Sequence, residues 1–107
     1  MSAIHNIYSN IPDHIPDELF EEILKTKHVK IERIVSKGHS SADNDWYDQD
    51  QNEWVILLQG SARLLFKDND KVVELKRGDH INIPSHARHK VEWTDPVTET
   101  IWLAVHY

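Results

Sequence analysis

The sequence predicts an all-β protein, an antiparallel sandwich or barrel of short strands preceded by one short helix. Three observations support this fold class. About seven or eight short segments rich in β-branched and aromatic residues follow one another after residue 28. Turn formers separate them, as in Gly60-Ser61, Asp68-Asn69-Asp70 and Asp95-Pro96. The length of 107 residues is enough for one domain with a single core.

Residues 1–28 are predicted to form an extended arm followed by a helix. Pro12 and Pro16 interrupt the polar arm, and Pro16 also suits the first position of a helix. The acidic residues that follow would complement the helix dipole. Four apolar side chains then recur at helical spacing: Leu19, Phe20, Ile23 and Leu24. We therefore predict an amphipathic helix over residues 16–26.

Residues 29–107 are predicted to form the β-barrel or sandwich itself. From Val29 the pattern changes from the helical period to the two-residue alternation of a strand. Residues 37–52 form the longest irregular stretch, although its end at 46–49 can already be extended. The other expected strands are residues 29–36, 54–58, 62–67, 71–75, 80–83, 89–93 and 100–106.

Composition excludes several classes of protein. The net charge is −6 and no run of Lys or Arg stands out, which argues against nucleic acid or an anionic membrane as partner. The absence of cysteine removes disulfides and thiolate metal sites. No helix-turn-helix segment indicates a transcription factor, and no apolar stretch approaches the length of a membrane span. The sequence therefore predicts a cytoplasmic protein whose partners are neither nucleic acid nor a membrane.

Two spaced motifs carry the functional signal. Glu53 is followed after six intervening residues by Gly60, and Gly78 is followed after five by Pro84, with His89 five positions further on. The two glycines fall where tight turns need a positive φ, and Pro84 can end a strand because it needs no ladder N–H. Glu53 and His89 are left as a carboxylate and an imidazole on two separate strands.

In these motifs the chain resembles the cupin superfamily over about residues 33–106. The resemblance implies a double-stranded β-helix barrel of the jelly-roll type, with Glu53 and His89 pointing into the barrel mouth. Strand alternation then predicts that Val55 and Leu57, and also Val91 and Trp93, point inward. The expected assembly of such a small cupin is a homodimer.

The sequence departs from the family pattern just before Glu53. Metal-binding cupins usually have His-X-His three or four residues before the motif glutamate. A gap of three places Tyr47 and Gln49 at those positions, and a gap of four places Trp46 and Asp48 there. Both registers stay open. The glycine that usually follows the motif proline is replaced by His86, a residue type that tolerates a positive φ better than most.

The predicted site follows from these alignments. The candidate metal ligands are Glu53, His89, Gln49 and Asp48, a mixed N/O set that suits Mn, Fe, Ni or Zn without selecting among them. The candidate ligand-binding residues are Tyr47, Gln49, Glu53, Arg88 and His89. Single histidines such as His80 and His106 are interpreted as structural, with a place in the cavity as the alternative.

Three functions compete. The first is a small cupin barrel that binds a small molecule, with or without a divalent metal. The second is a metal-dependent enzyme, a dioxygenase or a sugar isomerase or epimerase. The third is a metal-free acid–base enzyme that uses His89, Glu53 and Tyr47, with Arg33, Arg63 or Arg88 binding the substrate. The sequence does not identify the substrate or decide whether the protein is an enzyme.

Overall fold

The computed structural model describes residues 3–107 and consists of eight β-strands joined by turns and loops. The strands are β1 (Leu19–Lys25), β2 (Lys30–Ser36), β3 (Glu53–Gln59), β4 (Ser61–Phe66), β5 (Lys71–Lys76), β6 (His80–Ile83), β7 (His89–Thr94) and β8 (Thr100–His106). This arrangement confirms the predicted all-β class. Within the described residues, no helix is long and apolar enough to cross a membrane.

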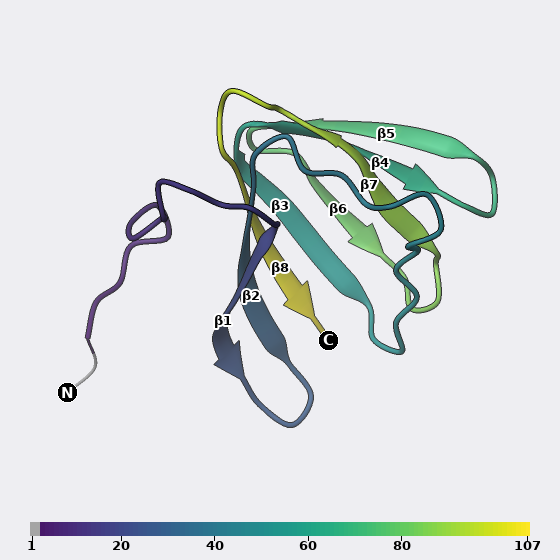
Figure 1. The fold of residues 1–107 in the computed structure, drawn as a ribbon. Helices are drawn as coiled ribbons and strands as arrows, with labels where there is room; N and C mark the ends of the chain where they lie inside the picture. Colours follow the sequence, from purple (N-terminus) through teal and green to yellow (C-terminus); the bar gives the residue numbers. More distant parts are fainter. Residues whose placement is uncertain (1–2) are drawn as a thin grey trace.

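The strands form two antiparallel sheets that face each other (Figure 1). One sheet has five strands in the order β1-β2-β8-β3-β6, and the other has three in the order β5-β4-β7. β6 pairs only with β3, and β7 only with β4 among the named strands, so no ladder joins the two sheets on that side. The barrel predicted from the sequence is therefore an open pair of sheets and is not closed.

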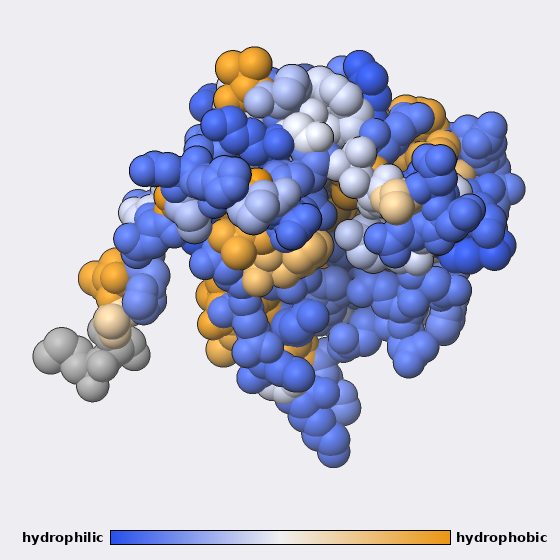
Figure 2. Space-filling view, viewed as in Figure 1, coloured by the Kyte–Doolittle hydropathy of each residue, from blue (hydrophilic) through white to orange (hydrophobic). Residues whose placement is uncertain are grey.

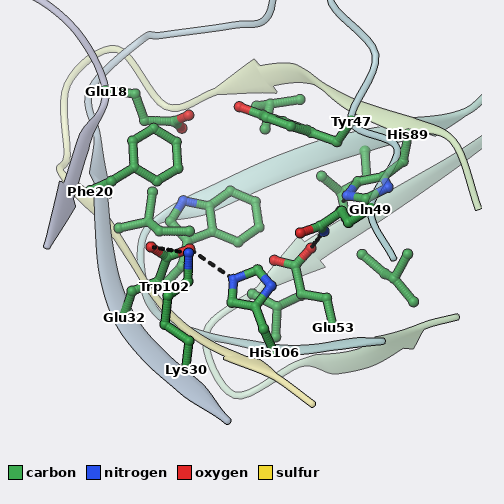
Figure 3. A pocket seen from close by; sticks show the side chains of 15 residues that line it. Glu18, Phe20, Lys30, Glu32, Tyr47, Gln49, Glu53, His89, Trp102 and His106 are labelled. Carbon is green, nitrogen blue, oxygen red and sulfur yellow. Dashed lines mark hydrogen bonds and ion pairs between the residues drawn. The ribbon is translucent and has the colours of Figure 1, made fainter. Parts of the chain in front are cut away.

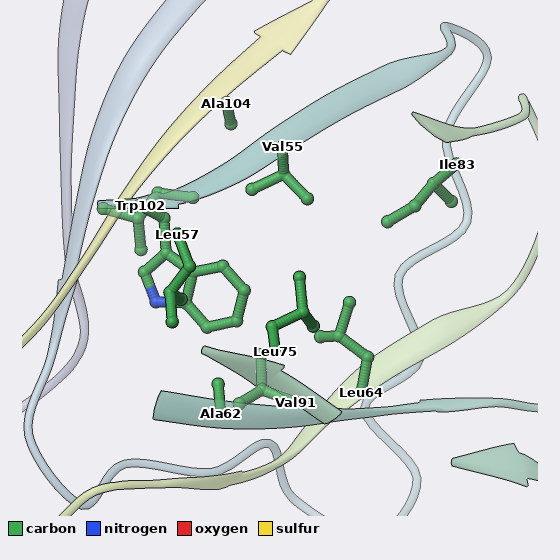
Figure 4. Close-up of a cluster of buried hydrophobic side chains, with 10 residues drawn as sticks. Val55, Leu57, Ala62, Leu64, Leu75, Ile83, Val91, Trp102 and Ala104 are labelled. Carbon is green, nitrogen blue, oxygen red and sulfur yellow. The ribbon is translucent and has the colours of Figure 1, made fainter. Parts of the chain in front are cut away.

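The hydrophobic core fills the space between the sheets (Figure 4). Leu57 of β3, Leu75 of β5 and Trp102 of β8 are almost fully buried there. The core does not occupy the whole space, because one end of it is lined by polar side chains instead. Apolar packing thus fixes the two sheets at one end and leaves a cavity at the other.

The helix predicted over residues 16–26 is wrong, because Leu19–Lys25 is strand β1 and pairs with β2. A β-bulge between Glu22 and Leu24 moves the side chains beyond it to the opposite face. Phe20 therefore lies opposite Ile34, and Leu24 lies opposite Ile31. Because of the bulge, the apolar residues before and after it are three or four positions apart, as they would be on one face of a helix. This spacing led to the wrong prediction of a helix. The bulged strand leaves hydrophobic surface exposed over the N-terminal strands (Figure 2).

The predicted alternation is confirmed in β3 and interrupted in β7. Val55, Leu57 and Val91 are buried, as predicted. Trp93 is not, and the inward position is taken by Thr94. Because Arg63 pairs with Trp93 while its neighbour Leu64 pairs with Val91, one residue of β7 is left over as a bulge. Trp93 consequently turns outward and stacks under the guanidinium of Arg63, 4.7 Å from its ring centroid.

The motif residues adopt the backbone conformations that their spacing predicts. Gly60 and Gly78 have φ of 86° and 90°, and His86 has φ of 62°. β6 ends at Ile83, directly before Pro84. A Cβ on Gly60 would lie 2.3 Å from Oγ1 of Thr100, whereas a Cβ on Gly78 would meet nothing within 4 Å. The two glycines therefore share the strain of a positive φ but differ in the space around them.

This difference predicts unequal costs for two alanine substitutions. Gly78→Ala should lower the free energy of unfolding by about 1–2 kcal/mol through backbone strain. Gly60→Ala should cost about 1–3 kcal/mol beyond that, since its methyl group also collides with Thr100. Urea denaturation of both variants measures the difference. Equal losses would show that the close approach of Thr100 is not a constraint.

Candidate functional site

A cavity of about 350 Å³ opens between the sheets beside the core (Figure 3). Its size lies at the lower end of the roughly 300–1,000 Å³ typical of small-molecule sites. Apolar side chains from both sheets form part of its wall. The polar and aromatic lining residues are Glu18, Phe20, Lys30, Glu32, Tyr47, Gln49, Glu53, His89, Trp102 and His106.

The first polar cluster is formed by Glu53, Gln49 and His89. Glu53 begins β3, His89 begins β7, and Gln49 lies in the loop before β3. The Gln49 amide donates to Oε1 of Glu53 at 2.8 Å, and Nε2 of His89 lies 3.5 Å from the same oxygen. Nδ1 of His89 is 2.8 Å from the carbonyl oxygen of Ala87. Since a carbonyl only accepts, Nδ1 carries a proton and Nε2 is the nitrogen that faces Glu53.

The Glu53 carboxylate stays charged although it is buried. Burial opposes ionisation, but contact with His89, the charge of His106 and the Gln49 amide outweigh it and hold the pKa of Glu53 below its ordinary value of 4.5. The Glu53 side chain is 11% exposed, and that of His89 only 5%. The cluster therefore presents a charged carboxylate inside a largely apolar cavity.

A second polar cluster lies beside the first, on β2 and β8 of the same sheet. Nε2 of His106 is 2.8 Å from Oε1 of Glu32, and the Lys30 ammonium is 3.8 Å from Oε2 of Glu32. The carboxylate accepts, so Nε2 of His106 carries the proton in this contact. Antiparallel pairing places Glu53 directly opposite His106. The two clusters thus share one face of one sheet.

The loop before β3 settles which residues take the positions of the usual His-X-His. Tyr47 and Gln49 line the cavity, as the gap of three predicts. Tyr47 and His89 exchange two backbone hydrogen bonds, of 2.7 and 3.1 Å, and their rings lie 5.5 Å apart. Burial, with the nearby charge of Glu18, raises the pKa of Tyr47 to about 12. The phenol therefore remains protonated and can donate a hydrogen bond.

Two of the predicted site residues lie away from this cavity. The Asp48 carboxylate is 2.7 Å from Nδ1 of His86 on the exposed surface, because alternation turns it away from Tyr47 and Gln49. Arg88 precedes His89 and points to the other face, where it donates to Asp68 at 2.8 Å. Neither side chain is among those lining the cavity. The structure brings together Tyr47, Gln49, Glu53 and His89 of the predicted set.

The other two candidate arginines also have partners elsewhere. Arg33 is buried on the outer face of β2, where it binds the Glu21 carboxylate and donates to the carbonyl oxygens of Ile7 and Ser9. It holds the N-terminal arm against the sheet. Arg63 stacks on Trp93, as described above. None of the three arginines proposed from the sequence as substrate-binding groups lines the cavity.

The β1 and β2 side of the cavity is not predicted from the sequence. Glu18 and Phe20 lie in the segment predicted as a helix, and Lys30 and Glu32 are not among the predicted site residues. His106, predicted to be structural with a place in the cavity as the alternative, lines the cavity. Lys30, Glu32 and Ile34 are alternate residues of one strand, and alternate residues share a face of the sheet. This alternation could have predicted that all three line the cavity.

The donor set does not fit a resident divalent metal. Within residues 3–107, no group of three His, Cys, Asp or Glu side chains is placed to hold a metal ion. Nε2 of His89 and the Glu53 carboxylate are two suitable donors, but the third neighbour, Gln49, presents its N–H group to Glu53. Structural and catalytic metal sites generally use three or more protein ligands.

The fold and site together define a cupin. Residues 32–106 match the Cupin domain family, and the chain belongs to that family. The matched region includes Glu53, His89 and the Glu32–His106 pair, and it begins after Glu18, Phe20 and Lys30.

Related proteins support the same family. The chain is 40% identical to a protein from Ralstonia eutropha JMP134 proposed as a mannose-6-phosphate isomerase, with a TM-score of 0.92 over 98% of this chain and 97% of that chain. A cupin superfamily protein from Desulfitobacterium hafniense DCB-2 shares the fold, with a TM-score of 0.73 at 18% identity over 90% of this chain and 82% of that chain. L-ectoine synthase from Rhodococcus opacus (strain B4) is 39% identical over 62 residues, which are 58% of this chain but only 45% of that enzyme.

Glu18 provides a test of the electrostatics of the cavity. Burial raises the pKa of Glu18 above its ordinary value of 4.5, although the Ser36 hydroxyl donates to the carboxylate and His39 favours its charge. A carboxyl with a raised folded pKa contributes stability below pH 4.5 that is lost as the pH rises through that folded pKa. Glu18→Gln removes this loss. We expect the variant to become more stable relative to the wild type between pH 4 and pH 7.5.

Urea denaturation at several pH values measures this effect. Glu74→Gln is a matched control, because Glu74 is an exposed residue of the edge strand β5. A stability difference between Glu18→Gln and wild type that does not change with pH would contradict the assignment.

Proposed function

We propose that this cupin binds a small organic molecule in the cavity and does so without a resident metal. The observation that supports the proposal most strongly is that two carboxylate–imidazole pairs converge on one cavity of about 350 Å³ whose remaining wall is largely apolar. Such a combination of apolar wall and few convergent polar groups is typical of small-molecule sites. Glu53, His89 and Gln49 would bind polar groups of the ligand from one side.

An acid–base enzyme is the second candidate, and a specific observation favours it. His89 and His106 each lie beside a carboxylate, and Tyr47 keeps its proton because its pKa is about 12. A base and an acid on different walls of a cavity are what proton transfer to and from a bound substrate requires. A dioxygenase is disfavoured, since it needs the metal ligands that the site does not supply.

Nuclear magnetic resonance titration with a library of small polar molecules tests binding directly. Backbone amide shifts caused by a bound molecule should gather on strands β2, β3, β7 and β8. Glu53→Gln or His89→Gln should weaken binding at least about tenfold, which corresponds to about 1.4 kcal/mol. Consumption of the added molecule during the titration would favour the enzyme over the binding protein.

Two control variants separate the site from its surroundings. Asp48→Asn and Arg88→Ala change side chains that the sequence assigned to the site but that lie outside the cavity. Both should leave affinity unchanged. A loss of affinity in these variants equal to that of Glu53→Gln would contradict the placement of the ligand.

Metal removal tests the remaining part of the proposal. Dialysis against a chelator should leave ligand affinity and the unfolding midpoint unchanged, because Glu53 and His89 alone supply too few ligands to retain a divalent ion. Elemental analysis of the purified protein measures the metal content. About one equivalent of Mn, Fe, Ni or Zn per chain would contradict metal-free binding.

A further inference from the structure

We infer that the molecule bound in this cavity is a compact organic cation, with an ammonium, amidinium or similar nitrogen group. The inference rests on the proposed function, because it concerns the chemical class of the ligand of the same site. It follows from three independent features of the cavity: the balance of charged side chains, the surplus of hydrogen-bond acceptors and the aromatic lining.

The charged side chains of the cavity are mostly acidic. Three carboxyl groups line it, from Glu18, Glu32 and Glu53, against the single ammonium of Lys30. Glu32 and Glu53 are 9% and 8% exposed, so water screens them little. A buried carboxylate is costly unless positive charge or hydrogen-bond donors compensate it. His106 and Lys30 supply part of that compensation for Glu32, and Gln49 and His89 for Glu53. A cationic ligand would add positive charge at the centre of the group.

The arginines of the chain do not compensate the carboxylates. Arg33 is held by Glu21 and the N-terminal arm, Arg63 by Trp93 and Arg88 by Asp68. The fourth, Arg77, is exposed in the turn after β5. A phosphate in the cavity would therefore meet three carboxyl groups without one guanidinium. This argues against a sugar phosphate as ligand, although one relative has been proposed to act on mannose 6-phosphate.

The Glu53 carboxylate also retains an acceptor toward the cavity. The Gln49 amide donates to Oε1 at 2.8 Å, and Nε2 of His89 lies 3.5 Å from the same oxygen, so both contacts fall on one of the two carboxylate oxygens. An N–H group of a cationic ligand can donate to the other oxygen, Oε2, and add its charge to that of the carboxylate.

Aromatic rings complete the cation site. Phe20 lines the cavity from β1, Trp102 from β8 and Tyr47 from the loop before β3, and Figure 3 shows their rings on one side of the polar side chains Glu32, His106 and Glu53. The faces of aromatic rings attract cations, and aromatic side chains commonly surround quaternary ammonium ligands. Phe20 and Glu18 precede the matched Cupin domain region, so this wall comes from the N-terminal strand.

The experiment compares two probes of nearly equal shape that differ in charge. Choline carries a trimethylammonium group, and 3,3-dimethylbutan-1-ol carries the uncharged tert-butyl group in its place. Amide shifts of the full chain, recorded at neutral pH, give the affinity for each, and mannose 6-phosphate serves as the anionic probe. We expect choline to bind at least about tenfold more tightly than the neutral alcohol, and mannose 6-phosphate not to bind.

Two variants locate the effect. Glu32→Gln should weaken choline binding about tenfold and leave binding of the neutral alcohol unchanged, whereas the charge-matched Glu74→Gln should alter neither. Phe20→Leu, at a half-exposed position that tolerates the change, should weaken choline binding several-fold by removing the ring face.

Equal affinities for choline and the neutral alcohol, or a preference for mannose 6-phosphate, would overturn the inference. In either case shifts at the cavity would leave the proposed binding function standing. If neither these probes nor the wider library shifts any cavity resonance, both the inference and the proposed function fail.

Discussion

The pairing of β3 with β8 is the constraint on which the candidate site depends. It places Glu53 opposite His106 and Val55 opposite Ala104, so that polar and apolar pairs follow one another along a single face of the sheet. The apolar pairs belong to the core between the sheets, and the polar pair lies at the end where the cavity opens. A shift of one residue in this pairing would turn Glu53 to the outside and close the site.

The buried carboxylates give the cavity its chemical character. Each has partners that keep it in place: Gln49 and His89 for Glu53, His106 and Lys30 for Glu32. These partners are one ammonium, one amide and two imidazoles, and no guanidinium is among them. The carboxylates therefore give the cavity its acidic lining, and the aromatic rings beside them complete the environment in which a cationic ligand is proposed to bind.

Local spacing in the sequence was sufficient to predict Glu53 and His89 as site residues. Glu53, Gly60, Gly78 and His89 follow a pattern in which each residue has its own local reason, either a turn or a strand end. Glu32 and His106 could not be found in this way, because they are 74 positions apart and meet only through the pairing of β2 with β8. The bulges in β1 and β7 were also unpredictable, since one additional residue reverses the alternation on which strand assignment relies. Those bulges explain both the wrong helix and the outward position of Trp93.

The most direct test of a single shared cavity is the imidazole nitrogen spectrum of His89 and His106 in wild type and in Glu53→Gln. We expect that removing this one charge shifts the ring nitrogen resonances of both histidines, because Glu53 contacts His89 and lies opposite His106. The exposed control Glu74→Gln should shift neither. A response confined to His89, with the His106 resonances unchanged, would show two independent polar clusters and would contradict a single shared cavity.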